Sequence, residues 1–365
     1  MPFRWPDNRL IDLFGIEHPI ILAPMAGAMD ADLAAEVSAA GGLGSLPCAM
    51  LTPAQVRDQL AQIRARTSKP INVNFFCHKA PVPNNARETR WRDTLKPYYE
   101  ELGIDPSAPV PTSNRAPFDS AFCEVIEELK PQIISFHFGL PTDELLRRVK
   151  AAGCRVISSA TTTAEAIWLE QHDVDAVIAQ GFEAGGHRGM FLTDDIAAQV
   201  GTFALVPQIV DNVKVPVIAA GGIGDARGIA AAFALGACGV QIGTAYLHCP
   251  EAKIAAPHRA AMKSACDDAT AITNLMTGRP ARGFINRIMR EIGPISDVAP
   301  QFPLAAGALA PLRVRAEAAG SGAFSPMWSG QAAALGREKA AGELTKRLAA
   351  EAQDQLRRLA VVSGA

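Results

Sequence analysis

Short apolar runs recur along the chain and are separated by longer polar or amphipathic stretches. The runs are rich in Val, Ile and Ala, a composition typical of parallel strands that are buried on both faces. Several of the intervening stretches begin with an Asp or Thr suited to a helix N-cap. Eight candidate strands result, at residues 20–25, 42–46, 71–76, 132–139, 155–160, 175–181, 215–222 and 239–244.

The clearest helices between these strands are predicted at residues 30–40, 52–66, 143–152, 161–171 and 225–235. Repeated strand–helix alternation predicts a parallel sheet covered on its outside by helices. Eight such units close a barrel, which needs roughly 250 residues, and the span from residue 20 to about 265 provides that length. We therefore predict an α/β fold of the (β/α)8 TIM barrel class, formed by residues 1–79 and 118–266.

Two stretches fall outside this repeat. Residues 80–117 are Pro-rich and polar, and they follow the third strand, which predicts an insertion on the catalytic face of the barrel. Residues 267–365 are expected to form loops and then a C-terminal helix. Packing of that helix on the barrel is favoured over a coiled-coil seam, and a homodimer stays open. The helix has a leucine face made of Leu344, Leu348, Leu356 and Leu359.

Composition narrows the class of protein. The 365 residues are 48% hydrophobic, which excludes a disordered chain, and 35 basic against 37 acidic residues exclude a nucleic acid as the expected partner. The first residues do not resemble a signal peptide, and there is no apolar run of about 18 residues that would span a membrane. Seven cysteines are scattered without a CxxC pair, so we expect reduced thiols and a cytoplasmic protein.

Candidate chemistry lies at the carboxyl ends of the predicted strands, where TIM barrels place their active sites. Glycines follow the seventh and eighth strands, and such glycines expose backbone N–H groups that bind a phosphate monoester. Gly222, Gly224 and Gly228 also imitate a dinucleotide fingerprint. That interpretation requires an acidic residue after the next strand, where Gln241 and Thr244 stand, so it is disfavoured. A purely structural role in tight turns stays open.

Two histidines are candidates for catalysis. His187 follows Gly185 and Gly186, a flexible pair that can aim the ring into the barrel mouth, and its alternative role is to anchor the loop. For His137, substrate contact and a structural role are evenly balanced. The sequence has no metal-ligand pattern such as HExxH, no GxSxG elbow and no Walker loop, so we expect no metal and a bound organic cofactor.

Six motifs together resemble one enzyme family. They are HPIILAPMAGAM at 18–29, INVNFFCHKAP at 71–81, SFHFGLP at 135–141, AQGFEAGGHRG at 179–189, VPVIAAGGIGDARG at 215–228 and GVQIGTAYLHCPEA at 239–252. The sequence resembles the nitronate monooxygenases, formerly called 2-nitropropane dioxygenases, over nearly its whole length, including FSPMWSGQAAAL at 324–335. SFHFG together with AQGFEAGGHRG is similar to the class I branch.

The resemblance implies FMN as the cofactor, a catalytic base at His187 and its substrate-pocket partner at His137. It further implies oxidation of alkyl nitronates, such as propionate 3-nitronate, or of nitroalkanes with O2 to carbonyl compounds and nitrite. An NAD(P)H-dependent FMN reductase of the same fold and a flavin sensor without turnover are the alternatives. The implied flavin contacts are Ala23, Pro24, Met25, Asn74, Gln180, Gly185, Gly186, Ala220, Gly221, Gly222, Gln241, Gly243 and Thr244.

Overall fold

A computed structural model describes residues 4–113 and 115–362 of the chain. Its main feature is a parallel eight-stranded barrel, which confirms the predicted fold class and all eight predicted strands. Hydrogen bonds of Leu43 with Ile20 and Leu22 join the first and second strands and close the barrel. The strands are β1 (Ile20–Leu22), β2 (Gly44–Pro47), β3 (Ile71–Phe76), β4 (Ile133–His137), β5 (Arg155–Ala160), β6 (Ala176–Gln180), β8 (Val217–Ala220) and β9 (Gly239–Ile242).

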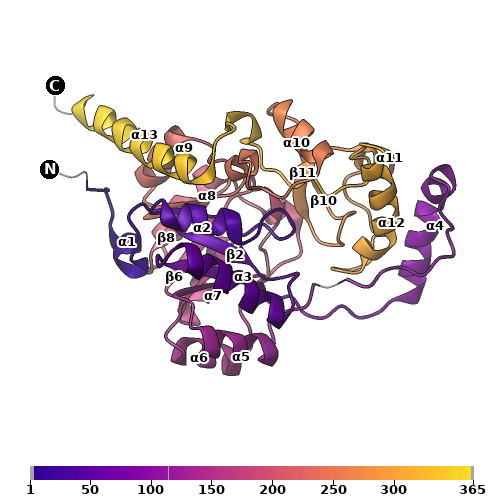
Figure 1. The fold of residues 1–365 in the computed structure, drawn as a ribbon, viewed down its shortest axis with the longest axis horizontal. Coiled ribbons are helices and arrows are strands. Elements are labelled where there is room, and N and C mark those ends of the chain that lie inside the picture. The colour runs from indigo at the N-terminus through magenta and orange to yellow at the C-terminus, as the bar shows by residue number, and fades with distance from the viewer. Residues whose placement is uncertain (1–3, 114, 363–365) are drawn as a thin grey trace.

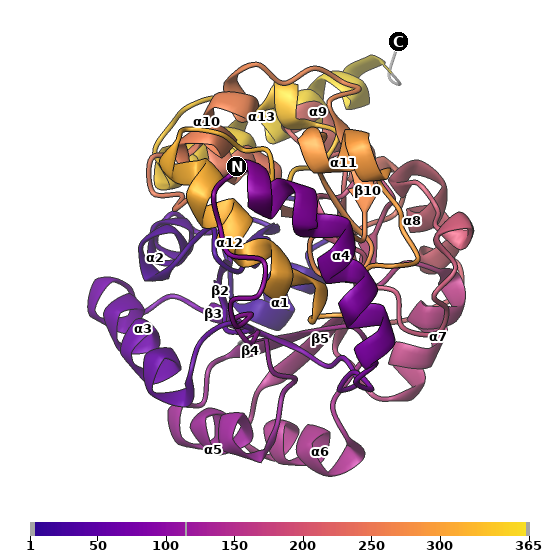
Figure 2. The same cartoon turned by 90° about the vertical axis from the view of Figure 1, so that its right-hand side faces the viewer.

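Helices surround the barrel, as Figure 2 shows. Asp30 and Thr52 accept backbone N–H bonds at two of the predicted helix starts, so the N-cap interpretation is confirmed there. All five predicted helices are present. The surrounding helices are α2 (Ala31–Ala39), α3 (Pro53–Arg66), α5 (Ser120–Leu129), α6 (Asp143–Ala151), α7 (Thr163–Gln171), α8 (Thr202–Val210) and α9 (Ala226–Ala234).

The barrel interior is filled mainly by branched side chains from the strands, and it is closed at its amino end by helix α1 (Arg9–Phe14). Leu10 and Phe14 of α1 pack with Ile21, Ile178 and Ile218. This plug leaves only the carboxyl ends of the strands open to a ligand, as is usual for the fold.

Residues 80–117 contain a helix that the sequence did not predict, α4 (Asn85–Glu101). Its residues are mostly polar and it contains Pro97, which is unfavourable inside a helix, so its sequence pattern is not that of a core helix. Trp91 and Tyr99 nevertheless bury their rings against helix α12 (Ala305–Ala318) and donate hydrogen bonds to its backbone carbonyls. Figure 2 shows α4 and α12 crossing in front of the barrel.

The C-terminal region also contains elements that the sequence did not predict. Strands β10 (Thr270–Thr273) and β11 (Ala281–Phe284) pair antiparallel, and β11 also pairs with β7 (Gly186–His187) from the barrel loop. Helices α10 (Ala256–Lys263), α11 (Arg287–Ile292) and α12 flank this small sheet, and α11 and α12 lie with α4 at the side opposite the chain termini (Figure 1). A second hydrophobic core joins these segments to α4.

Helix α13 (Ala341–Val362) lies on α2 and α9 (Figure 1). Leu344 and Leu348 are buried there and Leu356 is half-buried, so most of the leucine face lies against the helices of the barrel. Leu359 is 55% exposed. The remaining short elements are the 3-10 helices η1 (Ile196–Ala198), η2 (Thr244–His248) and η3 (Ala333–Leu335).

All seven cysteines are free thiols, in agreement with the reduced state expected from their spacing. Five are buried, Cys77 is half-buried and Cys266 is exposed. Within residues 4–113 and 115–362, no helix combines the length and the apolar character needed to cross a membrane.

Candidate active site

A cavity of about 430 Å³ opens at the carboxyl ends of the barrel strands. Its far wall comes from α12 and from residues 325–332, so the barrel and the C-terminal region enclose it together. Every candidate residue predicted from the sequence lines this single cavity. They are Ala23, Pro24, Met25, Asn74, His137, Gln180, Gly185, Gly186, His187, Ala220, Gly221, Gly222, Gln241, Gly243 and Thr244.

One end of the cavity is built from the loops after β8 and β9. Gly221 and Gly222 have positive φ values of 106° and 72°, a conformation that favours glycine. The backbone N–H groups of Gly222, Gly243 and Thr244 donate to no other residue in the described part of the chain. Such unpaired donors at one place form a binding site for an anion.

The hydroxyl group of Thr244 adds to this end of the cavity. Its Oγ1 accepts the N–H of Gly330 at 2.9 Å, so its own proton is left to donate to a ligand. Gly330 packs on Gly185, where a Cβ atom would lie 2.5 Å from the Gly330 nitrogen. Glycine at residue 185 is therefore required for close packing between the β6–β7 loop and the C-terminal region.

Amide side chains form the floor of the cavity. Asn74 donates from Nδ2 to the carbonyl and hydroxyl of Ser135. Both polar atoms of the Gln180 side chain form hydrogen bonds. Nε2 donates to the His187 carbonyl at 3.0 Å, and Oε1 accepts the Gly189 N–H at 2.7 Å. Gln241 differs, since its Oε1 is buried and has no partner among the described residues. A buried acceptor without a partner is costly, so a ligand donor at this place would be stabilising.

His187 is held in place rather than carried on a flexible loop. With Gly186 it forms β7, which pairs with Ala281 and Arg282 of β11. The ring Nε2 lies 2.9 Å from the hydroxyl of Thr277, whereas Nδ1 has no hydrogen-bond partner within the described ranges. The ring is surrounded by aromatic side chains, which are Phe76, Phe138, Phe302 and Trp328.

Burial holds the pKa of His187 well below its ordinary value. The positive charge of Arg115 lowers this pKa further, and smaller contributions come from His137, Arg279 and His78. The imidazole is therefore neutral at physiological pH, which is the protonation state that a proton acceptor needs.

His137 lies behind His187. Its Nε2 donates to the His187 carbonyl at 3.2 Å, and its Nδ1, 3.0 Å away, accepts the hydroxyl proton of Ser159. Burial is the main reason that the pKa of His137 falls to about 3, so the ring is neutral. Since both nitrogens are engaged, the ring positions His187 and has no free nitrogen for a substrate.

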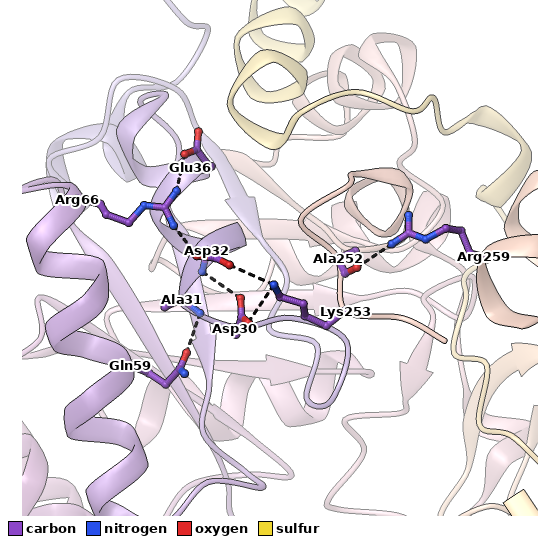
Figure 3. Close-up of polar contacts among 9 residues, drawn as sticks. All are labelled: Asp30, Ala31, Asp32, Glu36, Gln59, Arg66, Ala252, Lys253 and Arg259. Carbon is purple, nitrogen blue, oxygen red and sulfur yellow. Dashed lines mark hydrogen bonds and ion pairs between the residues drawn. The ribbon is translucent and has the colours of Figure 1, made fainter. Parts of the chain in front are cut away.

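Charged groups line the rim of the cavity. Lys253 lies 3.4 Å from a carboxylate oxygen of Asp30 and 3.1 Å from one of Asp32 (Figure 3). Arg313 contacts Glu317 at 2.9 Å. The guanidinium group of Arg115 lines the same cavity without an ion pair or side-chain hydrogen bond to any described residue.

Sequence reasoning missed several residues of this site. Thr277 and Arg115 lie outside the predicted strands and carry no motif that could have found them. Phe76 and Trp328 lie in segments quoted for the family resemblance, INVNFFCHKAP and FSPMWSGQAAAL, so the signal existed although no role was inferred from it.

The combined features fit an FMN-like ligand. Unpaired N–H groups at the glycine loops suit a terminal phosphate, and the unpartnered Oε1 of Gln241 suits a donor on a polar ring. The small residues Ala23, Gly185 and Gly243 leave room along the wall between these two places, and Gly243 would bring a Cβ within 3.2 Å of Ala23.

Comparisons with known proteins agree with this geometry. Residues 7–351 match the family model for nitronate monooxygenase. The chain is 43% identical to a nitronate monooxygenase of Pseudomonas aeruginosa, over 94% of this chain and 99% of that protein. It is 42% identical to a nitronate monooxygenase of Paraburkholderia phytofirmans, over 96% of each chain.

Solved structures give the same result. A nitroalkane oxidase from Streptomyces ansochromogenes superposes with a TM-score of 0.87 and 35% identity, covering 96% of this chain and 99% of that one. FabK from Thermotoga maritima superposes with a TM-score of 0.75 and 29% identity, covering 98% and 100%. With the family model spanning nearly all of its length and relatives above 40% identity, the chain belongs to the nitronate monooxygenase family.

Proposed function

We propose that this protein is an FMN-dependent nitronate monooxygenase that converts alkyl nitronates and O2 to carbonyl compounds and nitrite. The observation that carries the proposal is one cavity that joins an anion-binding glycine cradle to a half-buried, neutral His187. In this proposal residues 1–79 and 118–266 form the barrel, residues 80–117 are an insertion on its catalytic face, and residues 267–365 form loops and a helix that packs on the barrel.

The residues around the cavity have distinct roles toward the cofactor. Gly221, Gly222, Gly243 and Thr244 hold the phosphate through backbone N–H groups and one hydroxyl, with Ala220 at the start of the first loop. Residues 23–25 and 185–186 would hold the ring, and Asn74, Gln180 and Gln241 would supply polar groups beside it. When bound, FMN takes electrons from the substrate and passes them to O2.

His187 acts on the proton of a neutral nitroalkane. An Nε2–H donated to the hydroxyl of Thr277 leaves the lone pair on Nδ1, the nitrogen without a protein partner, to accept the substrate α-proton. A nitronate has already lost this proton, so its oxidation does not need a base. The neutral ring favours this role over that of a charged donor to the nitronate.

The surroundings of His187 prepare it for this role. His137 of β4 and Gln180 of β6, the two strands on either side of β5, both donate hydrogen bonds to its backbone carbonyl. The aromatic side chains around the ring exclude water, which keeps the imidazole neutral and its tautomer set by Thr277.

Location and assembly complete the proposal. Seven free thiols suit a reducing compartment, and we place the enzyme in the cytoplasm. The alternatives for assembly are a monomer and a homodimer, and light scattering of the purified holoenzyme distinguishes them by molar mass.

The proposal is tested first by the identity of the cofactor. Mass spectrometry of the cofactor released from purified protein should find FMN, because the site has donors for one terminal phosphate. FAD, or a folded preparation without flavin, would contradict the proposal.

Anaerobic stopped-flow mixing then separates the proposed activity from its main alternative, an NAD(P)H-dependent FMN reductase. Ethylnitronate or propionate 3-nitronate should bleach the flavin much faster than NADH does, and aerobic turnover should release nitrite. Fast bleaching by NADH with no nitrite from either nitronate would assign the protein to the reductases.

A further inference from the structure

Glu183 is a carboxylate in the wall of a cavity whose glycine loops suit an anion. It lies beside Gly222 in the loop after β8, where a Cβ atom added to the glycine would be 3.5 Å from the Cβ of Glu183. A free carboxylate at this place would repel the phosphate that the unpaired N–H groups are proposed to hold. The hydrogen bonds of Glu183 show how its charge is accommodated.

The side chain of Glu183 caps a helix that belongs to another segment. Helix α8 begins at Thr202, and Gly201 before it has no side chain that could accept the first N–H groups. The N–H of Thr202 donates instead to the two carboxylate oxygens of Glu183, at 3.0 and 2.9 Å. A helix N-terminus stabilises negative charge, so Glu183 has the role that an N-cap residue normally has.

Thr202 extends this contact to the first phosphate loop. Its hydroxyl oxygen lies 2.7 Å from a carboxylate oxygen of Glu183 and 2.9 Å from the carbonyl oxygen of Gly221, so one hydroxyl proton serves two acceptors. The packing here is close, because a Cβ atom at Gly181 would lie 1.8 Å from the same hydroxyl oxygen. The start of α8 is therefore held against the peptide group between Gly221 and Gly222.

The backbone of Glu183 is connected to the second phosphate loop. Its carbonyl accepts the N–H of Gln331 at 3.0 Å, and the N–H of Gly330 donates to Oγ1 of Thr244 at 2.9 Å. A Cβ atom at Gly330 would lie 2.8 Å from the Glu183 carbonyl oxygen, so these segments are also in close contact. One residue is thus linked to Gly221 through its side chain and to Thr244 through its main chain.

We propose that Glu183 is a positioning residue for the flavin phosphate, because it holds the N–H of Gly222 and the hydroxyl of Thr244 at the spacing that one phosphate needs. The inference rests on the proposed function, which takes FMN as the ligand. A trans peptide group points its C=O and its N–H in opposite directions. Contact of the Thr202 hydroxyl with the Gly221 carbonyl therefore turns the N–H of the same peptide away from α8 and toward the cavity.

Exchange of the bound flavin isolates the contribution of the phosphate. Riboflavin lacks only the phosphate of FMN, so incubating holoenzyme with riboflavin and measuring the released FMN gives the ratio of the two dissociation constants. In Glu183→Ala this ratio should shift toward riboflavin by roughly 10-fold, in line with the loss of one charge-assisted hydrogen bond. In Glu183→Gln the amide oxygen still accepts the Thr202 N–H, and the ratio should stay close to that of the wild type.

Glu170→Ala is the matched control. Oε1 of Glu170 accepts the N–H groups of Lys214 and Val215 ahead of β8, and Glu170 does not line the cavity. This variant therefore removes another carboxylate that holds backbone N–H groups, and its exchange ratio should equal that of the wild type. An equal shift in Glu170→Ala and Glu183→Ala would assign the effect to general destabilisation and overturn the proposal.

The direction of the shift separates positioning from charge repulsion. If Glu183 acted on the phosphate only through its negative charge, Glu183→Ala and Glu183→Gln would both favour FMN over riboflavin, and this result would overturn the proposal. Weaker binding of both flavins with an unchanged ratio would also overturn it, because a purely structural role predicts that result. Thr202→Val should reproduce the shift of Glu183→Ala, whereas Thr202→Ser keeps the hydroxyl and should not.

These measurements are separable from the proposed function, since flavin exchange needs no turnover. A wild type that retains FMN but oxidises no nitronate would refute the proposed function, and the exchange ratios would still test Glu183. If the wild type binds no FMN, titration calorimetry with inorganic phosphate tests the same loops. Phosphate should then bind more weakly to Glu183→Ala than to the wild type or Glu170→Ala, and equal binding to all three would overturn the role of Glu183.

Discussion

The ring of His137 donates a hydrogen bond to the backbone carbonyl of His187, at 3.2 Å. The two histidines therefore have different roles. The ring of His137 supports the backbone of His187, and the ring of His187 faces the cavity. The hydroxyl of Ser159 donates a hydrogen bond to the other ring nitrogen of His137, Nδ1. A substitution of His187 should therefore affect proton transfer directly, and a substitution of Thr277 should affect it through the tautomer of the His187 ring.

Replacing His187 with Asn should remove the base. Turnover of nitroethane should fall roughly 10²- to 10⁴-fold, the usual contribution of a positioned general base, while ethylnitronate should be much less affected. Steady-state rates on both substrates, measured with flavin occupancy, check this. Equal losses on the two substrates with FMN retained would refute the selective role, and loss of FMN would indicate that the ring mainly orders the loop.

Thr277→Val should impair proton abstraction without emptying the site. The hydroxyl is the only hydrogen-bond partner of the His187 ring among the described residues, so its removal leaves the tautomer unfixed. We expect a loss of roughly 10-fold on nitroethane, in line with one neutral hydrogen bond, and a smaller loss on ethylnitronate. Thr277→Ser keeps the hydroxyl and should restore activity. A valine variant as active as the wild type would exclude this role.

Gly185→Ala should weaken flavin binding through packing alone. The added methyl group would meet the Gly330 nitrogen at 2.5 Å, which forces the β6–β7 loop and the C-terminal region apart. Flavin retained after gel filtration should fall well below one per chain. Gly153→Ala serves as the control, because its positive φ of 90° imposes backbone strain while nothing lies within 4 Å of the new methyl group. Similar flavin loss in both variants would assign the effect to general destabilisation.

Acid should destabilise the protein through its buried histidines. Burial lowers the pKa of His78 and of His258 to about 4, from an ordinary value near 6.5. Above pH 6.5 both rings are neutral in the folded and unfolded states. Between pH 6.5 and about 4 the unfolded chain binds protons that the folded chain refuses, so the free energy of unfolding falls, by at most about 1.4 kcal/mol per pH unit for each ring.

Urea unfolding at pH 7.5, 6.5 and 5.5 measures this dependence. His258→Phe removes one titrating ring from a site beside Phe284 and should reduce the slope below pH 6.5. An unchanged slope in this variant would show that His258 is not kept neutral by the fold.

The barrel could be predicted from the sequence because each strand is a short apolar run whose burial follows from its own composition. The positions of the glycine loops and of His187 could be predicted in the same way, because each comes shortly after a predicted strand in the sequence. Strand β7 could not be predicted, because it has two residues and forms only by pairing with β11, a distant segment of the chain. Strands β10 and β11 mix polar and apolar residues and so lack the apolar run that marked the barrel strands. Thr277 illustrates the difficulty, as it lies 90 residues from the ring it contacts.

Arg115 was missed for a different reason. It lies in a Pro-rich polar stretch without periodicity, where a charged side chain is normally solvated. Val110 and Pro111 pack closely on Gly307, a residue almost 200 positions later in the sequence. The charge of the site is thus determined by tertiary contacts that a one-dimensional pattern does not contain.

The pairing of β7 with β11 imposes an order on biosynthesis. His187 is synthesised long before residues 281–284, so β7 has no strand to pair with while the intervening chain is being made. The barrel strands and phosphate loops end at residue 244, so these parts are complete earlier. A chain terminated between the two points would contain both phosphate loops, but it would lack the strand that supports His187 and the residues 325–332 that form the far wall of the cavity. Translation therefore completes the barrel loops before it completes the enclosure of the site.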